Sequence, residues 1–456
     1  MIVVNWSLLQ IDLLIQIVEN HLTSVDDVIV FSSVCRSWNC ATRACNKLKL
    51  RQNWLGRQMP WLMLTDGNDD EVYSDAGSYI DHMFENNVLG LSDEDEDEDL
   101  SDEDDLIQEV QCDENELLVD SCYYSDINDG IRKLFNLSHC HNKSYNLSLP
   151  QLYGKACWGS RYGWMVTLGL DRRMHLFNPL TKAQLPLPSQ TTFRYPWSRA
   201  RDKTIRVLFL TKVVLLRVPQ ADREDDNESS WLVVAIHRSY SLVAIARPGD
   251  AAWTHLKWPD GLHILMDVIY CTKLKSLLFI DADGDLFYYD VHNSKQPQEF
   301  KEYLNGPDDV SKGLPNNGTI EPYMYLVQCG DILLVIARYK RHYFVNDRKY
   351  KTQDFKVFRL CSPDTSWEEL SHLGNIALFV GGNETMCIDA SDGGCRSNCI
   401  YFCDEECKSF RFNRDKVGGR DMGVFSLSRK TIEPIYEGNN RKSSHCSPFW
   451  FSPSIF

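Results

Sequence analysis

The chain has 456 residues with a formal net charge of −16, and its 43% hydrophobic and 25% charged residues are ordinary for a globular protein with a sizeable core. No apolar run approaches the roughly 18 residues of a membrane-spanning helix, and the first ten residues lack the basic flank of a secretory signal, so we expect neither feature. Sixteen cysteines in such a chain indicate reduced thiols, in the nucleus, the cytoplasm or both.

The N-terminal segment, residues 6–45, has apolar residues at helical spacing. Leu9, Leu13 and Ile17 recur at three- to four-residue intervals, and the same period resumes between residues 28 and 38. This spacing predicts three short helices whose shared core is too small to be very stable alone. The exposed apolar stripe of such a unit needs a partner, which is either the rest of the chain or another protein.

Two motifs in this segment together resemble an F-box: Trp6-Ser7-x-Leu9-x-x-Asp12-Leu13-Leu14-x-x-Ile17 and Asp27-Val28-x-x-Phe31-x-x-Val34-Cys35-Arg36-Ser37-Trp38. Gln10 stands where a proline is usual, and Val30 and Ser32 stand where arginines are usual. The resemblance implies docking on the Skp-type adaptor of a cullin-RING ubiquitin ligase, with an amphipathic surface laid against helices of the adaptor. The residues expected on that surface are Leu9, Leu13, Leu14, Ile17, Val34, Cys35 and Trp38. The alternative is a helical cap packed on its own domain.

A strongly acidic segment follows, because residues 66–130 contain 25 Asp and Glu and no Lys or Arg. The rest of the chain is mildly basic, with 39 acidic against 48 basic side chains. Within the segment, Asp93–Asp105 places eleven carboxylates in thirteen positions, and their mutual repulsion predicts disorder. The sign of the charge excludes nucleic-acid binding by this segment.

Ser92 and Ser101 are each followed by three acidic residues, which resembles the sites of acidophilic casein-type kinases. We expect phosphorylation there to add negative charge and to change binding to basic partners in a salt-dependent way. The alternative is an inert, solubilising loop.

From residue 60 onward, short runs rich in β-branched and aromatic residues recur between Gly, Pro, Asn and Asp. About 320 residues of such hairpins, at ~40–50 residues for each blade, predict a β-propeller of six or seven blades, with an open sandwich as the alternative. Asp283-Gly284 predicts a type I′ turn with positive φ at both central residues. Trp253 and Trp367 follow similar strand and turn patterns, and we expect both to pack in the core.

Further motifs resemble the kelch-like propeller of a large plant F-box family: Cys157-Trp158-Gly159-Ser160-x-x-Gly163-Trp164, Leu176-Phe177-Asn178-Pro179-Leu180-Thr181, Asp267-Val268-Ile269-Tyr270, Asn398-Cys399-Ile400-Tyr401-Phe402 and Trp450-Phe451-x-Pro453. This resemblance implies a substrate-recognition subunit of an SCF-type (Skp–cullin–F-box) ubiquitin ligase whose propeller binds an unknown target protein. It also implies that Trp61–Leu64 pairs antiparallel with Lys133–Leu137 in the first blade.

The expected architecture is mostly β. A three-helix F-box covers residues 1–50, a connector covers 51–59, and a propeller covers 60–456. The disordered acidic stretch 66–130 is then an insertion within the first blade. The alternative function is a non-ligase scaffold or protein-binding module with a degenerate F-box.

No catalytic constellation stands out, so we expect a chain that is not itself an enzyme and that needs no cofactor or metal. Cys395, Cys399, Cys403 and Cys407 recur at intervals of four, but residues four apart on a strand lie ~13 Å apart, too far for one zinc ion. Buried reduced thiols are the expectation. A basic and aromatic cluster over residues 338–351 favours a solvated hairpin on the propeller rim over nucleic-acid binding or nuclear import.

Overall fold

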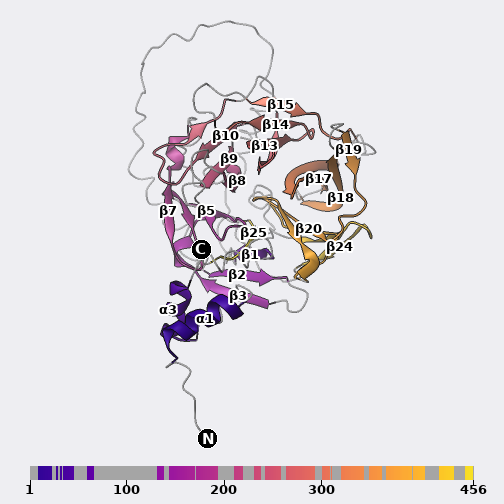
Figure 1. The fold of residues 1–456 in the computed structure, drawn as a ribbon. Helices are drawn as coiled ribbons and strands as arrows, with labels where there is room; N and C mark the ends of the chain where they lie inside the picture. The colour runs from indigo at the N-terminus through magenta and orange to yellow at the C-terminus, as the bar shows by residue number, and fades with distance from the viewer. Residues whose placement is uncertain are drawn as a thin grey trace, which may run out of the picture.

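A computed structural model provides the structure of the chain (Figure 1). It describes residues 9–22, 27–28, 31–32, 34–45, 59–65, 131–137, 143–169, 171–193, 210–218, 231–237, 242–257, 263–292, 300–308, 310, 320–343, 349–361, 366–392, 394–405, 421–435 and 447–454. No helix within these ranges is long and apolar enough to cross a membrane.

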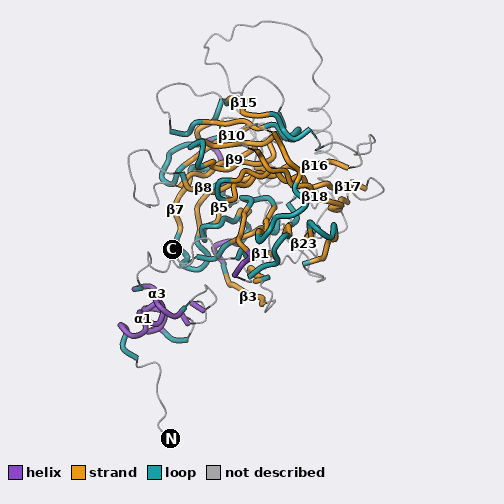
Figure 2. The backbone as a smooth tube through the Cα atoms, turned by 45° about the vertical axis from the view of Figure 1, so that its right-hand side comes forward, coloured by secondary structure: helices purple, strands orange, loops and turns teal. Residues whose placement is uncertain are grey.

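The N-terminal helical unit lies outside the ring of blades in both views (Figures 1 and 2). It contains α1 (Ile11–His21) and α3 (Arg36–Ala44), with short helical stretches at residues 27–28 and 31–32 between them. Its small core consists of Leu14, Val18, Val28, Phe31, Ala41 and Cys45. Leu180 of the β domain packs against the edge of this core, so the helical unit rests on the propeller.

The described strands form six sheets, which stand as blades around a central axis (Figure 1). Blade 1 contains β25 (Phe449–Phe451), β1 (Trp61–Thr65), β2 (Ile131–Asn136) and β3 (Lys143–Ser148). Blade 2 contains β4 (Ala156–Trp158), β5 (Met165–Leu168), β6 (Met174–Phe177) and β7 (Gln184–Leu187). Blade 3 contains β8 (Leu210–Arg217), β9 (Trp231–His237), β10 (Leu242–Ala246) and β11 (Thr254–His255).

The second half of the ring has the same plan with one variation. Blade 4 contains β12 (Leu265–Cys271), β13 (Ser276–Asp281), β14 (Leu286–Tyr289) and β15 (Lys301–Leu304). Blade 5 contains β16 (Ile320–Cys329), β17 (Ile332–Tyr343), β18 (Lys349–Cys361) and β19 (Ser366–Glu369). Blade 6 has five strands, β20 (Ile376–Val380), β21 (Met386–Asp389), β22 (Cys399–Phe402), β23 (Gly423–Ser426) and β24 (Thr431–Pro434). Because the β20–β21 hairpin doubles back, β22 pairs parallel with β20, whereas all other described pairs are antiparallel. Short 3₁₀ turns lie at Pro150–Leu152, Gln190–Thr192 and Ala390–Asp392.

The ring is closed by strands from the two ends of the β domain. β25 pairs with β1, with Leu62 opposite Trp450, so the first blade combines both ends of the chain. β1 also pairs antiparallel with β2, and Leu64 lies opposite Lys133, which confirms the predicted pairing of Trp61–Leu64 with Lys133–Leu137. Because the ring is closed, the propeller has no open sheet edge of the kind that a sandwich would leave. The closed ring contains six blades and not seven.

The hydrophobic core is divided into clusters between neighbouring blades. Six clusters of buried residues occur, one at each of the six junctions of the ring. The alternation of strand side chains explains the arrangement: Trp61 and Met63 face blade 2, while Leu62 and Leu64 face blade 6. A blade that is buried on both faces therefore needs strands with unbroken runs of apolar residues.

Tryptophans connect adjacent blades, as predicted for Trp253 and Trp367. The Trp253 indole N–H donates to the Pro188 carbonyl, 3.1 Å away across the junction of blades 2 and 3. Trp367 donates likewise to Asn305 at 2.9 Å, between blades 5 and 4. The Trp253 ring is thus buried in the interblade core, whereas Trp367 is half-buried at the edge of the core, and each indole satisfies its single donor.

The hairpin at Asp283–Gly284 forms, but its turn type differs from the prediction. Strands β13 and β14 pair as expected, with Ile280 opposite Leu286. Only Gly284, at φ +94°, has a positive φ, so the turn is not type I′. The Asp281 carboxylate accepts hydrogen bonds from the backbone N–H groups of Asp283 and Asp285 and stabilises a wider loop instead.

Removal of the acidic segment is expected to leave the propeller folded. Residues 66–130 lie outside the described ranges, but Thr65 and Arg132 at their two ends are paired neighbours on β1 and β2. A short Asn-Gly turn in place of residues 66–131 can therefore join the two strands. We expect the melting temperature to change by no more than about 4 °C, which corresponds to roughly 1–2 kcal/mol. A larger fall in differential scanning calorimetry would show that the segment is an ordered part of the domain.

Candidate functional site

Exposed apolar side chains are concentrated on the helical unit. Among the described residues, seven large hydrophobic side chains are exposed, and three of them belong to this small unit: Ile11 at 47%, Leu13 at 45% and Val34 at 54%. Exposed hydrophobic residues gathered on one small element are typical of a protein-binding surface.

The residues predicted for an adaptor-binding surface separate into three groups. Leu13 and Val34 are exposed. Leu9, Ile17, Cys35 and Trp38 are half-buried, and the Trp38 ring lies 4.3 Å from that of Phe31. Leu14 is fully buried in the core of the unit and is not accessible to a partner in this arrangement. Ile11, which the prediction omitted, is exposed in the first turn of α1, two residues before Leu13.

Both described helices begin without a side-chain cap. The residue before α1 is Gln10, whose carbonyl accepts from the N–H groups of Leu13 and Leu14 while its side chain makes no capping bond. The residue before α3 is Cys35, which also caps nothing. Gln10 nevertheless has φ −61°, which is the value that a proline ring imposes. Gln10 therefore keeps the backbone conformation that proline would have and loses only its rigidity.

A buried carboxylate joins four blades of the propeller. Asp267, at the start of β12 in blade 4, forms an ion pair with Lys212 Nζ of blade 3 at 2.7 Å. The same carboxylate accepts from the Leu326 N–H of blade 5 at 3.0 Å and from the Thr385 hydroxyl of blade 6 at 2.8 Å. Asp267 and Lys212 are both almost completely buried, so their charges depend on each other for stabilisation.

A second buried network lies beside this one, between blades 5 and 6. The Arg338 guanidinium contacts the Asp421 carboxylate at 2.9 Å, the Tyr325 hydroxyl at 3.2 Å and Glu405 at 3.3 Å. Glu405 also pairs with Lys340 at 2.9 Å. Arg338 and Lys340 are 0% and 2% exposed. The prediction of a solvated basic hairpin is therefore wrong for these two residues, because their charges are used inside the propeller.

The surrounding charges determine how the buried carboxyl groups titrate. Burial alone would raise the pKa of Glu405, but Lys340, Arg338 and Lys212 outweigh it and lower that pKa below its ordinary value. Glu384 lies beside Arg161, with Nε–Oε1 at 2.7 Å, while its other oxygen is buried without a hydrogen-bond partner. Burial, together with the negative charge of Asp267, raises the pKa of Glu384 to about 7 despite Arg161.

The raised pKa of Glu384 predicts a pH-dependent stability. The folded chain binds this proton more tightly than the unfolded chain, where the pKa is about 4.5, so the resulting stabilisation is present below pH 4.5 and is lost as the pH rises to about 7. We expect ionisation of Glu384 to lower the unfolding free energy of the wild-type chain by about 2–3 kcal/mol between pH 5 and pH 7.5. The Glu384→Gln variant should lack this fall. Urea unfolding of both proteins at pH 5, 6 and 7.5 measures it, and equal slopes would contradict the assignment.

The cysteines do not form a metal site within the described part of the chain, where no three His, Cys, Asp or Glu side chains come together as a metal-binding group. Burial raises the pKa of Cys395 to about 11 and that of Cys403 to about 12, so these thiols are protonated at neutral pH and are poor ligands. Cys407 lies outside the described residues.

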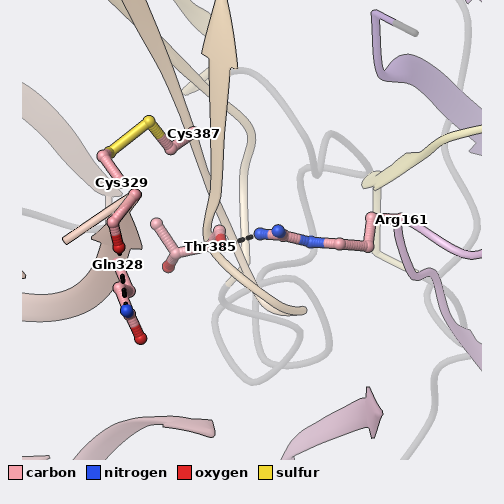
Figure 3. The surroundings of a disulfide bond; sticks show 6 residues. Arg161, Gln328, Cys329, Thr385 and Cys387 are labelled. Atoms are coloured by element: carbon pink, nitrogen blue, oxygen red, sulfur yellow. Dashed lines mark hydrogen bonds between the residues drawn. A yellow bond between two sulfur atoms is a disulfide. The ribbon is translucent and has the colours of Figure 1, made fainter. Parts of the chain in front are cut away.

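One cysteine pair differs from the expectation of reduced thiols. Cys329 at the end of β16 and Cys387 in β21 form a disulfide, with their Cα atoms 5.7 Å apart, and so link blades 5 and 6 (Figure 3). The sequence offered no signal for this pair, because 58 residues separate the two cysteines. In the same view Arg161 reaches from blade 2 and donates to the Thr385 carbonyl at 3.1 Å, two residues before Cys387 (Figure 3).

Comparison with known proteins identifies the family. The profile described as "KIB1-4 beta-propeller" matches residues 134–426, which is more than half of the chain. The chain belongs to the KIB1-4 beta-propeller family. The similarity to plant F-box proteins that carry a propeller is thereby confirmed.

Relatives of this family member occur in Arabidopsis thaliana. The F-box/kelch-repeat protein KIB1 is 20% identical over 269 residues, which cover 59% of this chain and 60% of KIB1. The F-box protein At2g05970 is 21% identical over 456 residues, which cover 99% of this chain and 97% of that protein. Another relative, At5g60060, is 23% identical over 194 residues, so the match spans 42% of this chain and about half, 46%, of that relative's length.

Proposed function

We propose that this chain is a substrate-recognition subunit of an SCF-type ubiquitin ligase. In this proposal the helical unit docks on a Skp-type adaptor and through it on a cullin, and the propeller binds a target protein. The observation that carries the proposal is the exposure of Ile11, Leu13 and Val34 on the helical unit. The names of the related Arabidopsis proteins support it, because they are F-box proteins.

The propeller suits the second part of this role. Six interblade clusters and the buried Asp267 and Arg338 networks hold the blades rigidly, so that the loops between strands can vary without loss of the fold. No catalytic role is assigned to the chain in this proposal; ubiquitin transfer belongs to the other subunits. The nuclear or cytoplasmic location, and phosphorylation of Ser92 and Ser101, which lie outside the described residues, stay predictions.

The proposal is tested by direct capture. A purified plant Skp-type adaptor is immobilised on a biolayer interferometry sensor, and the full chain is applied at increasing concentration. We expect saturable binding to the sensor, and we expect an excess of free adaptor in solution to abolish it. Absence of binding by a chain with a cooperative melting transition would favour a scaffold that no longer engages the ligase.

The uncapped helices favour this scaffold as the alternative function. Without caps at Gln10 and Cys35, the helical unit is held together mainly by its small core.

We expect Gln10→Pro to stabilise the unit by about 0.4–1 kcal/mol, because the backbone already has a proline-like φ. Thermal unfolding measured by circular dichroism at 222 nm, together with adaptor affinity, checks this. Weaker affinity in the variant would mean that Gln10 itself is needed for the interaction.

A further inference from the structure

A hollow of about 670 Å³ opens on the outside of the propeller between blades 4 and 5. Its floor includes Phe358, which belongs to the interblade core, and its walls include Leu304 of β15 and Trp367 of β19. Tyr303 is exposed at its mouth, with its ring edge-on to Tyr288 at 6.2 Å. The hollow is thus lined by aromatic and aliphatic surface that continues inward into the core.

The loop beside the hollow is fixed in place by its own contacts. Gly306 presses against the Gly284 turn so closely that an added Cβ would lie 2.5 Å from the Gly284 carbonyl carbon. The Gly306 N–H also donates to the Asp285 carboxylate at 2.7 Å, and the Trp367 indole holds the Asn305 carbonyl at 2.9 Å. These contacts fix the loop against the Gly284 turn of blade 4 and against Trp367 of blade 5, so the hollow is formed before any partner arrives.

The charge around the hollow has one sign. Among the described residues that line it, Asp308 and Glu369 are acidic and none is basic. Both carboxylates are exposed, and neither has a hydrogen-bond or ion-pair partner within the described part of the chain. The neighbouring Glu368 is neutralised by Arg359, so Glu369 is the carboxylate of β19 that is left for a partner.

We propose that this hollow binds an extended segment of the target protein that carries a cationic side chain, arginine or lysine. The inference deepens the proposed function, on which it rests, by assigning it a recognition site and a class of target. Aromatic faces at Tyr303 and Trp367 attract a cation, and the carboxylates of Asp308 and Glu369 complement its charge. β15 and β19 are the outermost strands of their sheets, so extended backbone can lie along them.

The test uses the full chain and a short fluorescein-labelled peptide of alternating valine and arginine. Its twin replaces each arginine by citrulline, which keeps the shape and removes the charge. We expect fluorescence polarisation to show roughly tenfold tighter binding of the arginine peptide at 0.1 M salt, and weaker binding at 0.5 M salt. Equal affinity for the two peptides, or no binding of either, would overturn the proposal.

Two variants and a matched control locate the site. Tyr303→Ala removes an exposed ring and Glu369→Lys reverses an exposed charge. Each is expected to lower the affinity for the arginine peptide about fivefold. Asp331→Lys makes the same charge change at the exposed β16–β17 turn of the same blade and is expected to leave the affinity unchanged. If Asp331→Lys weakened binding as much as Glu369→Lys, the attraction would come from net charge and the site would be rejected.

Adaptor capture by the same samples separates this inference from the proposed function. A chain that captures the adaptor but does not distinguish the two peptides refutes only the hollow as a recognition site. A chain that selects the arginine peptide through Tyr303 and Glu369 but fails to capture the adaptor keeps the site and refutes the ligase role.

Discussion

Asp267→Ala is expected to destabilise the propeller by about 3–5 kcal/mol, more than any other single substitution of a polar residue discussed above. The reason is that Lys212 would keep a buried charge without its partner, while the Leu326 N–H and the Thr385 hydroxyl would lose their acceptor. Urea unfolding followed by tryptophan fluorescence measures the loss, since Trp253 and Trp450 are buried between blades.

A second substitution tests the cause of that loss. In the double variant Asp267→Ala, Lys212→Met no buried charge is left alone, so we expect much of the stability to return. Asp171→Ala serves as the control, because Asp171 is exposed, its ion pair with Arg173 is long at 3.7 Å, and the hydrogen bond that it accepts from the Arg173 N–H at 3.2 Å is exposed to solvent; its effect should stay below about 1 kcal/mol. A double variant as unstable as Asp267→Ala would show that the lost hydrogen bonds from the Leu326 N–H and the Thr385 hydroxyl, and not the lysine charge, dominate.

Leu13→Asp and Val34→Asp are expected to weaken adaptor binding about thirtyfold each, which corresponds to about 2 kcal/mol. Each places a charge at an exposed apolar position of the proposed interface. Leu13 lies in the first turn of α1, where an acidic side chain favours the helix, so the fold is expected to survive the change. Biolayer interferometry against the immobilised adaptor measures the affinities.

Controls distinguish a lost interface from a lost fold. Gln16→Asp adds the same charge at another exposed position of α1 and is expected to leave the affinity nearly unchanged. Leu14→Ala removes a fully buried side chain and should unfold the helical unit, with loss of both helical signal and adaptor binding. Unchanged affinity in Leu13→Asp and Val34→Asp would exclude this surface as the docking site.

The propeller was predictable because its signals are local and repeated. Alternating and continuous apolar strands gave the blades, and the pairing of Trp61–Leu64 with Lys133–Leu137 followed from recognising the first blade across a long insertion. Trp253 could be assigned to the core, and Trp367 to its edge, because both follow the same strand and turn pattern and each bonds to the neighbouring blade.

Contacts that depend on closing the ring were not predictable. Asp267 is an isolated carboxylate beside the apolar residues of its strand, which indicates a buried polar role. Its partners could not be read from the sequence, because they are residues 212, 326 and 385 of three other blades. The sequence around Arg338 and Lys340 indicates a surface cluster, because it shows their basic neighbours and not the Asp421 and Glu405 carboxylates that face them.

The helical surface was predicted in part. Helical period alone does not separate the two sides of an apolar stripe, so Leu14 was grouped with Leu13 although one is buried and the other exposed. Ile11 was missed because it lies between Leu9 and Leu13, off the four-residue period that they share. The hollow between blades 4 and 5 was not foreseen at all, since it depends on how Gly306 meets Gly284.

Co-elution with both ligase components tests the central claim most directly. The full chain, a Skp-type adaptor and a cullin are mixed and passed through size-exclusion chromatography with light scattering. The proposed function predicts one peak with the mass of a 1:1:1 complex, which Leu13→Asp should split into the free chain and the adaptor–cullin pair. A wild-type chain that elutes alone, with its propeller folded, would contradict the assignment as a ligase subunit.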